Sequence, residues 1–133
     1  MKRNHSLSLI LGASALLVLA ASPASAADPS KEISTAATHA GLAAGSSDLK
    51  MVHTHLQHVI NCLVGPGGAG FDAAPGNPCK DQGAGAIPDA PPAKQKELQA
   101  AVGMAKTGLG QSDVAKAKQE AGEIQAALSK AAM

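Results

Sequence analysis

Residues 46–68 read SSDLKMVHTHLQHVINCLVGPGG and contain the signals of one complete helix. Its apolar side chains recur at alternating intervals of three and four residues, at Leu49, Val52, Leu56, Val59 and Leu63. This spacing places them on one face of an α-helix. Ser47 or Asp48 is a suitable N-cap, and the glycines and proline of 65–68 end the helix. The stretch therefore predicts an amphipathic helix with one buried face.

Three further segments of the chain have the same helical spacing. They run from Ser30 to about Ala44, from Ala93 to about Thr107, and from a cap at Ser112 through Leu128. Short glycine-containing breaks join the four segments into two helical hairpins, 30–64 and 93–131. Amphipathic hairpins bury their apolar faces most simply against each other. The sequence therefore predicts an all-α fold, a small four-helix bundle with a long Gly/Pro-rich loop at 65–92.

The first 26 residues have the three parts of a secretory signal. The basic residues, the apolar run and the small-residue cleavage site are, in order, Lys2 and Arg3, Leu7 to Ala21, and Ala24-Ser25-Ala26. The apolar run is short for a spanning helix, and no second apolar stretch of about 20 residues follows it. We therefore expect export to the periplasm or medium, with no membrane association after removal of residues 1–26. The remainder, 27–133, is expected to form a single helical domain.

Two cysteines, Cys62 and Cys79, frame the first part of the loop. In an exported chain an even number of cysteines favours a disulfide over a redox or metal-binding thiol pair. Closing a loop of this size stabilises a fold by about 3 kcal/mol on the chain-entropy model. We expect the bridge to fold the part of the loop that contains Phe71 over the end of the second helix. The part beyond it, GAGAIPDAPPA at 83–93, is expected to have no such anchor.

Charge and composition exclude several classes of function. Without the signal, nine lysines face ten acidic residues, and the chain has no arginine. Phe71 is the only aromatic residue, so the basic stripe and stacking rings of a nucleic-acid binder are missing. The chain also has no serine elbow, paired-carboxylate arrangement or phosphate loop. We therefore expect a protein that is neither an enzyme nor a nucleic-acid binder.

Histidines cluster in the second predicted helix and its hairpin partner. At 100° per residue, Met51, His55 and His58 form one stripe beside the apolar face. His55 and His58 are three residues apart, close enough for both imidazoles to bind one ion. A thioether one turn earlier adds a soft ligand suited to copper. The stripe predicts a copper or zinc site.

The first hairpin offers a second pair of histidines. With its turn near Ser46, antiparallel packing places His39 level with His53. The sequence thus predicts two ligand pairs, and a periplasmic protein that binds or buffers metal.

Three other interpretations stay open. Histidines and a methionine beside the apolar face of a helix are often merely solvated or packed. The chain could instead be a non-catalytic structural or interaction protein whose disulfide-anchored loop presents Phe71 to a protein partner. A haem-binding bundle is the least favoured, because there is no Cys-x-x-Cys-His attachment motif and one aromatic residue makes a thin wall for a macrocycle.

The segment HTHLQHVINCLVGPGGAGFDAAPGNPC, from His53 to Cys79, resembles a stretch of small, uncharacterised secreted bacterial proteins. The resemblance covers about a quarter of the chain after the signal. It implies that the histidines and the cysteine-bounded loop belong to one structural unit, and it implies no activity.

Overall fold

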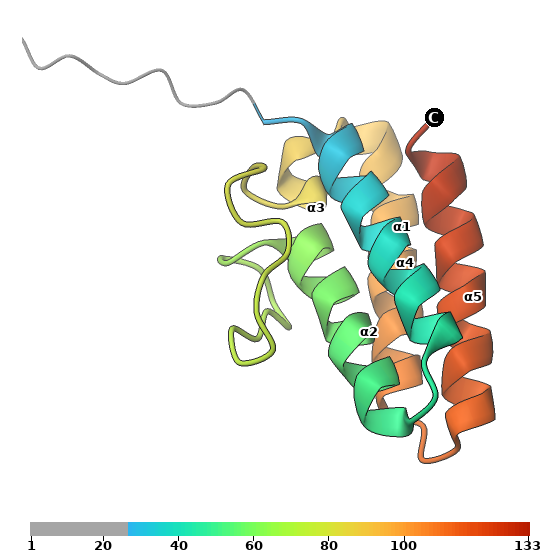
Figure 1. The fold of residues 1–133 in the computed structure, drawn as a ribbon. Coiled ribbons are helices and arrows are strands. Elements are labelled where there is room, and N and C mark those ends of the chain that lie inside the picture. Colours follow the sequence, from blue (N-terminus) through green and yellow to red (C-terminus); the bar gives the residue numbers. More distant parts are fainter. Residues whose placement is uncertain (1–26) are drawn as a thin grey trace, which may run out of the picture.

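The computed structural model describes residues 27–133, and this part of the chain contains five helices and no strand (Figure 1). The helices are α1 (Pro29–Gly45), α2 (Leu49–Val64), α3 (Ala86–Asp89), α4 (Pro92–Leu109) and α5 (Val114–Ala131). The predicted all-α class is confirmed. The predicted secretory signal, 1–26, lies outside the described residues.

Aspartates begin three of the long helices. The Asp28 carboxylate accepts hydrogen bonds from the backbone N–H groups of Ser30 and Lys31, and Pro29 occupies the first turn. Asp48 caps α2, one of the two residues that the sequence suggested. Asp113, and not the expected Ser112, caps α5 by accepting from the N–H of Lys116. Each carboxylate satisfies an otherwise unpaired N–H group and faces the positive end of the helix dipole.

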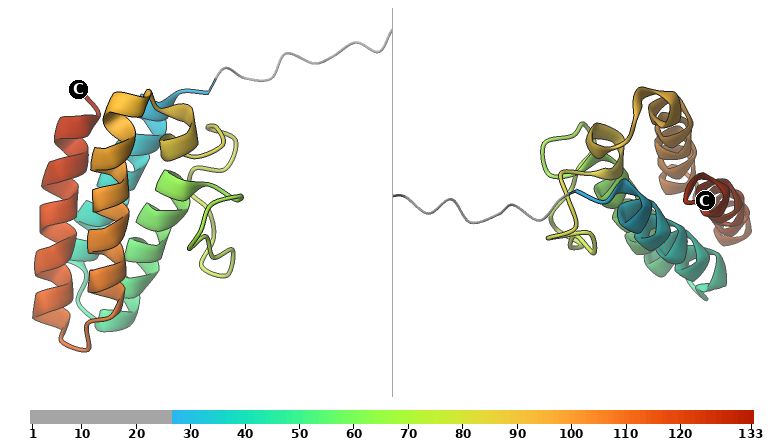
Figure 2. Two further views of the ribbon diagram at one scale, coloured as in Figure 1. Left: turned by 180° about the vertical axis from the view of Figure 1, so that it is seen from behind. Right: turned by 90° about the horizontal axis from the view of Figure 1, so that it is seen from above.

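The four long helices lie side by side and share one core (Figures 1 and 2). Helix α1 packs against α2 and α5, and α4 packs against the same two helices. The contribution of α1 is almost entirely alanine, at Ala36, Ala37, Ala40 and Ala43. The larger buried side chains come mainly from the other helices, at Val52, Leu56, Val59, Ile60, Leu63, Leu98, Ile124 and Leu128. Small side chains on α1 let its backbone approach its neighbours closely.

The long loop follows the outer side of α2, on the side away from α5 (Figures 1 and 2). A disulfide joins Cys62 to Cys79, with their Cα atoms 5.1 Å apart, which confirms the expected bridge. The disulfide does not reach segment 83–93, but non-covalent contacts hold this segment in place. This segment contains α3, Ala86 is fully buried, and the N–H of Gly85 donates a hydrogen bond to the carboxylate of Glu32.

Gly65, at the C-terminal end of α2, allows the second part of the loop to approach α2 closely. Its φ is +68°, and a Cβ atom at this position would clash with the carbonyl oxygen of Ala84. Only glycine fits both the backbone angle and this close approach. The segment before α3 therefore packs directly on the C-terminal end of α2.

No helix within 27–133 is long and apolar enough to cross a membrane.

Candidate metal centre

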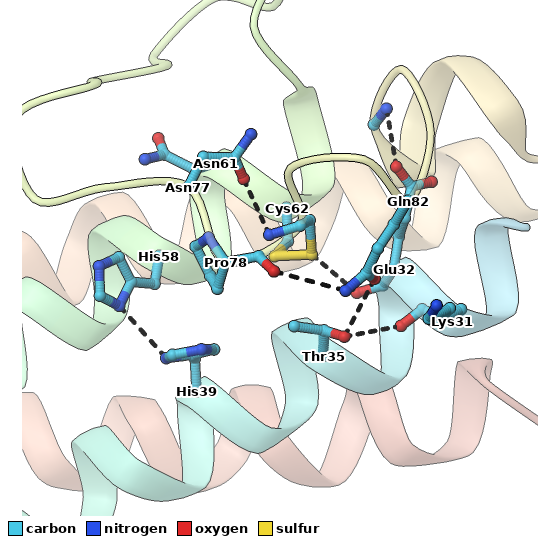
Figure 3. The surroundings of a disulfide bond; sticks show 12 residues. Lys31, Glu32, Thr35, His39, His58, Asn61, Cys62, Asn77, Pro78 and Gln82 are labelled. Atoms are coloured by element: carbon cyan, nitrogen blue, oxygen red, sulfur yellow. Dashed lines mark hydrogen bonds between the residues drawn. A yellow bond between two sulfur atoms is a disulfide. The ribbon is translucent and has the colours of Figure 1, made fainter. Parts of the chain in front are cut away.

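Three histidines from two helices point toward one another. His39 lies on α1, and His55 and His58 lie on the neighbouring α2, three residues apart. Figure 3 shows His39 and His58 facing each other across the space between the two helices, close to the disulfide. All three rings are partly buried. We call His39, His55 and His58 the histidine cluster.

The cluster converges through one type of atom. The Nδ1 atom of His39 lies 3.2 Å from Nδ1 of His55 and 3.2 Å from Nδ1 of His58. The ring centroids are 4.7 to 5.6 Å apart. A single proton on His39 Nδ1 can serve as a donor to both neighbours, and the two other Nδ1 atoms then act as acceptors. If that proton leaves, three lone pairs face a common point.

A backbone carbonyl sets the tautomer of His58. Its Nε2 atom lies 2.7 Å from the carbonyl oxygen of Pro75, so Nε2–H donates to this oxygen. In the neutral ring the proton is then on Nε2, and Nδ1 carries a lone pair. Histidines that bind metals usually donate their second N–H to a carbonyl or carboxylate in this way. His58 is thus oriented and protonated as a ligand requires.

The surroundings of His39 and His55 favour their neutral forms. Burial, with added repulsion from His58 and His55, lowers the pKa of His39 from 6.5 to about 4. Burial lowers the pKa of His55 as well, with a further contribution from His58. A neutral imidazole can coordinate a metal and an imidazolium cannot. At neutral pH, therefore, few protons need to be displaced from His39 and His55.

The spacing of the three nitrogens fits a transition-metal ion. Tetrahedral zinc, with Zn–N bonds of about 2.0–2.1 Å, holds its ligand nitrogens about 3.3 Å apart. Two of the three nitrogen pairs in the cluster are 3.2 Å apart. One ligand atom from each residue lies within 4.8 Å of the other two, and no other such group of three occurs in the searched part, 27–133. Three imidazoles also suit copper and nickel.

The structure groups the expected ligands differently from the predicted pairs. His55 and His58 lie together, but His39 joins them instead of pairing with His53. The Nε2 atom of His53 lies 3.1 Å from the carbonyl oxygen of Gln111, in the connection between α4 and α5. Met51 is 42% exposed, whereas the three clustered histidines are partly buried. The two predicted pairs are thus replaced by one group of three.

The remaining residues singled out by the sequence lie in or beside the loop. Cys62 and Cys79 are buried in the disulfide and leave no free thiol in the described part. Phe71 is partly buried and is not one of the residues that form the core. Its predicted role as a partner anchor stays a prediction.

Two buried polar side chains were not predicted from the sequence. Asn61, fully buried on α2, donates to the carbonyls of Asp72 and Gly76 and accepts from the N–H of Asp72. Glu32, fully buried on α1, accepts from Gly85 and leaves its Oε2 atom without a partner. The sequence signal that could have indicated their burial is their position. Each polar residue is adjacent in the sequence to an apolar residue on the core face of its helix.

The environment of Glu32 favours its protonated form. Burial raises the pKa of Glu32 to about 7, the hydrogen bond from Gly85 opposes this rise, and the nearby Asp89 carboxylate adds to it. Asp89 itself accepts from the N–H of Ala84. Glu32 and Asp89 therefore fix the segment before α3 through consecutive backbone amides.

Comparisons of the chain with models of protein families, with curated proteins and with solved structures find no match.

Proposed function

We propose that the protein binds one transition-metal ion, Zn(II) or Cu(II), through the Nδ1 atoms of the histidine cluster. The observation that carries this proposal is the convergence of His39 Nδ1 on two other imidazole nitrogens at 3.2 Å. The lowered pKa values of His39 and His55 and the fixed tautomer of His58 support it. On this proposal the protein binds or buffers metal without catalysing a reaction.

The divalent order of affinities places Cu(II) above Zn(II) on the same imidazole ligands. A thioether favours Cu(I) instead, and Met51 lies one turn before His55. We therefore assign Met51 no part in binding Zn(II) and keep it as an auxiliary ligand for Cu(I) only.

Isothermal titration calorimetry of the purified, oxidised protein with Zn(II) or Cu(II) at neutral pH tests the proposal. Mass spectrometry under non-denaturing conditions should find one ion per chain. The matched control is the variant His39→Ala, His55→Ala, His58→Ala, which keeps His53 and the disulfide. If this control binds the ions as tightly as the wild-type protein does, the cluster is not a metal site.

Export is the second part of the proposal. The predicted signal at 1–26 and a disulfide that forms in oxidising compartments support a periplasmic or secreted location. The intact mass of the exported protein should correspond to a chain that begins at Ala27 and lacks two hydrogens. Retention of the apolar run, or two thiols that react with an alkylating agent without reduction, would contradict this part.

A further inference from the structure

The carbonyl that sets the tautomer of His58 belongs to a loop segment that is fastened on both sides. Pro75 lies between Asp72 and Gly76, whose carbonyl oxygens are 2.6 and 2.7 Å from the Nδ2 atom of Asn61. The N–H of Asp72 donates in return to Oδ1 of Asn61 at 3.0 Å. One buried side chain of α2 thus holds the backbone on each side of Pro75.

The disulfide fastens the same segment a few residues further on. Cys79 is bonded to Cys62, which follows His58 by one helical turn on α2. Three side chains within residues 58–62 of α2 therefore hold segment 72–79. They are the imidazole of His58, the amide of Asn61 and the sulfur of Cys62. In Figure 3, Pro78 lies between the disulfide and the pair formed by His39 and His58.

We propose that Asn61 and the Cys62–Cys79 bridge are positioning groups for the metal centre, acting through Pro75 and His58. They hold the Pro75 carbonyl where it accepts the Nε2 proton of His58, and this contact presents the Nδ1 lone pair to the ion. The inference rests on the proposed function. It makes the affinity for metal depend on the oxidation state of two cysteines that are not ligands.

The Pro75 contact affects metal affinity because the His58 ring has other tautomers and orientations, which compete with the one that binds the ion. Without the carbonyl, the neutral ring of His58 is free to rotate and to move its proton to Nδ1, the atom that must bind the ion. Loss of such an outer hydrogen bond typically weakens metal affinity by about 10- to 100-fold. Among the described residues, neither His39 nor His55 makes a hydrogen bond through Nε2. The effect should therefore fall on His58 alone.

Zn(II) affinity, measured by competition with a chromophoric chelator, tests the coupling in four proteins. These are the wild type, Cys62→Ser with Cys79→Ser, His58→Ala, and the combination of all three changes. We expect the serine pair to weaken binding by about 10- to 100-fold. The combined variant should bind no more weakly than His58→Ala, because the bridge has nothing left to position. Equal losses from the serine pair in both backgrounds, or no loss in either, would overturn the inference.

A second variant addresses the same segment while the disulfide is intact. Asn61→Ala should weaken Zn(II) binding in the same way, because it releases the backbone on both sides of Pro75. Gln95→Ala is the matched control, since it removes a side-chain contact with the carbonyl of Ala90, outside segment 72–79, and should leave the affinity unchanged. If Asn61→Ala binds Zn(II) as the wild type does, the inference fails even though the metal site stands.

The nitrogen chemical shifts of His58 in the metal-free protein give a readout that general destabilisation does not move. We expect the pattern of an Nε2–H tautomer in the oxidised wild type and averaged tautomers in the serine pair. An unchanged Nε2–H pattern in the serine pair would contradict a positioning role. If the oxidised wild type binds no Zn(II) at all, the proposed function fails, and that result is distinct from binding that ignores the bridge.

Discussion

The Nδ1 atoms of His39 and His58 lie 3.2 Å apart, although 19 positions separate the two residues along the chain. They come from α1 and α2, so only the packing of these helices brings them together. A proton or a metal ion can satisfy such a nitrogen pair, and the two compete for the same lone pairs.

The first prediction separates His39 from His53. His39→Ala should weaken Zn(II) binding by about 100-fold, equivalent to about 2.7 kcal/mol, because it removes the nitrogen that both other rings approach. His53→Ala should change the affinity by less than about twofold, because that ring contacts the Gln111 carbonyl instead of the cluster. Calorimetric titration of both variants decides the matter. Equal losses would indicate binding spread over surface histidines.

The second prediction concerns pH in the metal-free protein. The pKa of His39 is lowered from 6.5 to about 4, so the unfolded chain binds more protons than the folded one between these values. The stability due to the neutral ring is therefore complete above pH 6.5 and is lost as the pH falls toward about 4. Ring C–H chemical shifts followed against pH should show His39 titrating near pH 4. A midpoint near 6.5 for His39 would mean that its ring is solvated.

The third prediction concerns the buried carboxyl of Glu32. Its folded pKa of about 7 lies above the ordinary 4.5, so its contribution to stability is present below pH 4.5 and is lost as the pH rises through 7. Glu32→Gln keeps an oxygen for the Gly85 amide and removes the charge. It should raise the free energy of unfolding at pH 8 by about 1 to 3 kcal/mol, and by less at pH 5. Urea denaturation at both pH values measures this, and a loss of stability at pH 8 would contradict it.

The fourth prediction compares two glycines of the loop. Gly65→Ala places a Cβ atom against the carbonyl of Ala84 in a left-handed backbone conformation, so we expect a loss of at least about 2 kcal/mol. At Gly67 an added Cβ meets nothing within 4 Å. Gly67→Ala should therefore stay within about 0.5 kcal/mol of the wild type. Chemical denaturation of the two variants checks the difference, and equal stabilities would mean that the segment before α3 is not docked on α2.

The fifth prediction addresses Phe71 as a partner anchor. The side chain is partly exposed and lies outside the core, so Phe71→Ala should cost only about 1 kcal/mol. A thermal melt measures this cost. A loss of about 3 kcal/mol or more, the scale for an aromatic core side chain, would show that Phe71 is structural and cannot serve as an exposed anchor.

The sequence predicted α2 and the disulfide well because their signals are local. The apolar side chains of α2 repeat with the helical period, and all five that the sequence selected contact or belong to the core. Two cysteines in a chain with a predicted secretory signal leave a single intramolecular pairing. Neither inference needs to know how one helix is turned against another.

Which histidines meet His39, in contrast, depends on how α2 is rotated against α1. The sequence placed His53 opposite His39, whereas the structure places His55 and His58 there, two and five residues further along α2. Connection 46–48 sets this offset through its backbone, and an apolar stripe broad enough to pack in several registers does not reveal it. Helix α3 was missed for a related reason. Its four residues are too few for a helical period, and its anchor, Glu32, lies 53 residues before Gly85 in the chain.

Polar contacts are distributed unevenly between the α4–α5 hairpin and the part of the chain before it, and this affects how easily each part unfolds locally. Apart from the junction at 90–95, the contact of His53 with Gln111 is the only side-chain hydrogen bond in the described part that joins the α4–α5 hairpin, including its connection, to the preceding segment. The loop is instead fastened to α2 by the buried Asn61 amide and the disulfide, and to α1 by the buried Glu32 carboxyl group. The α4–α5 hairpin is therefore held to the other half mainly by the apolar core that the four long helices share. In native-state hydrogen exchange, its amides should become exposed at a lower free energy than those of α2.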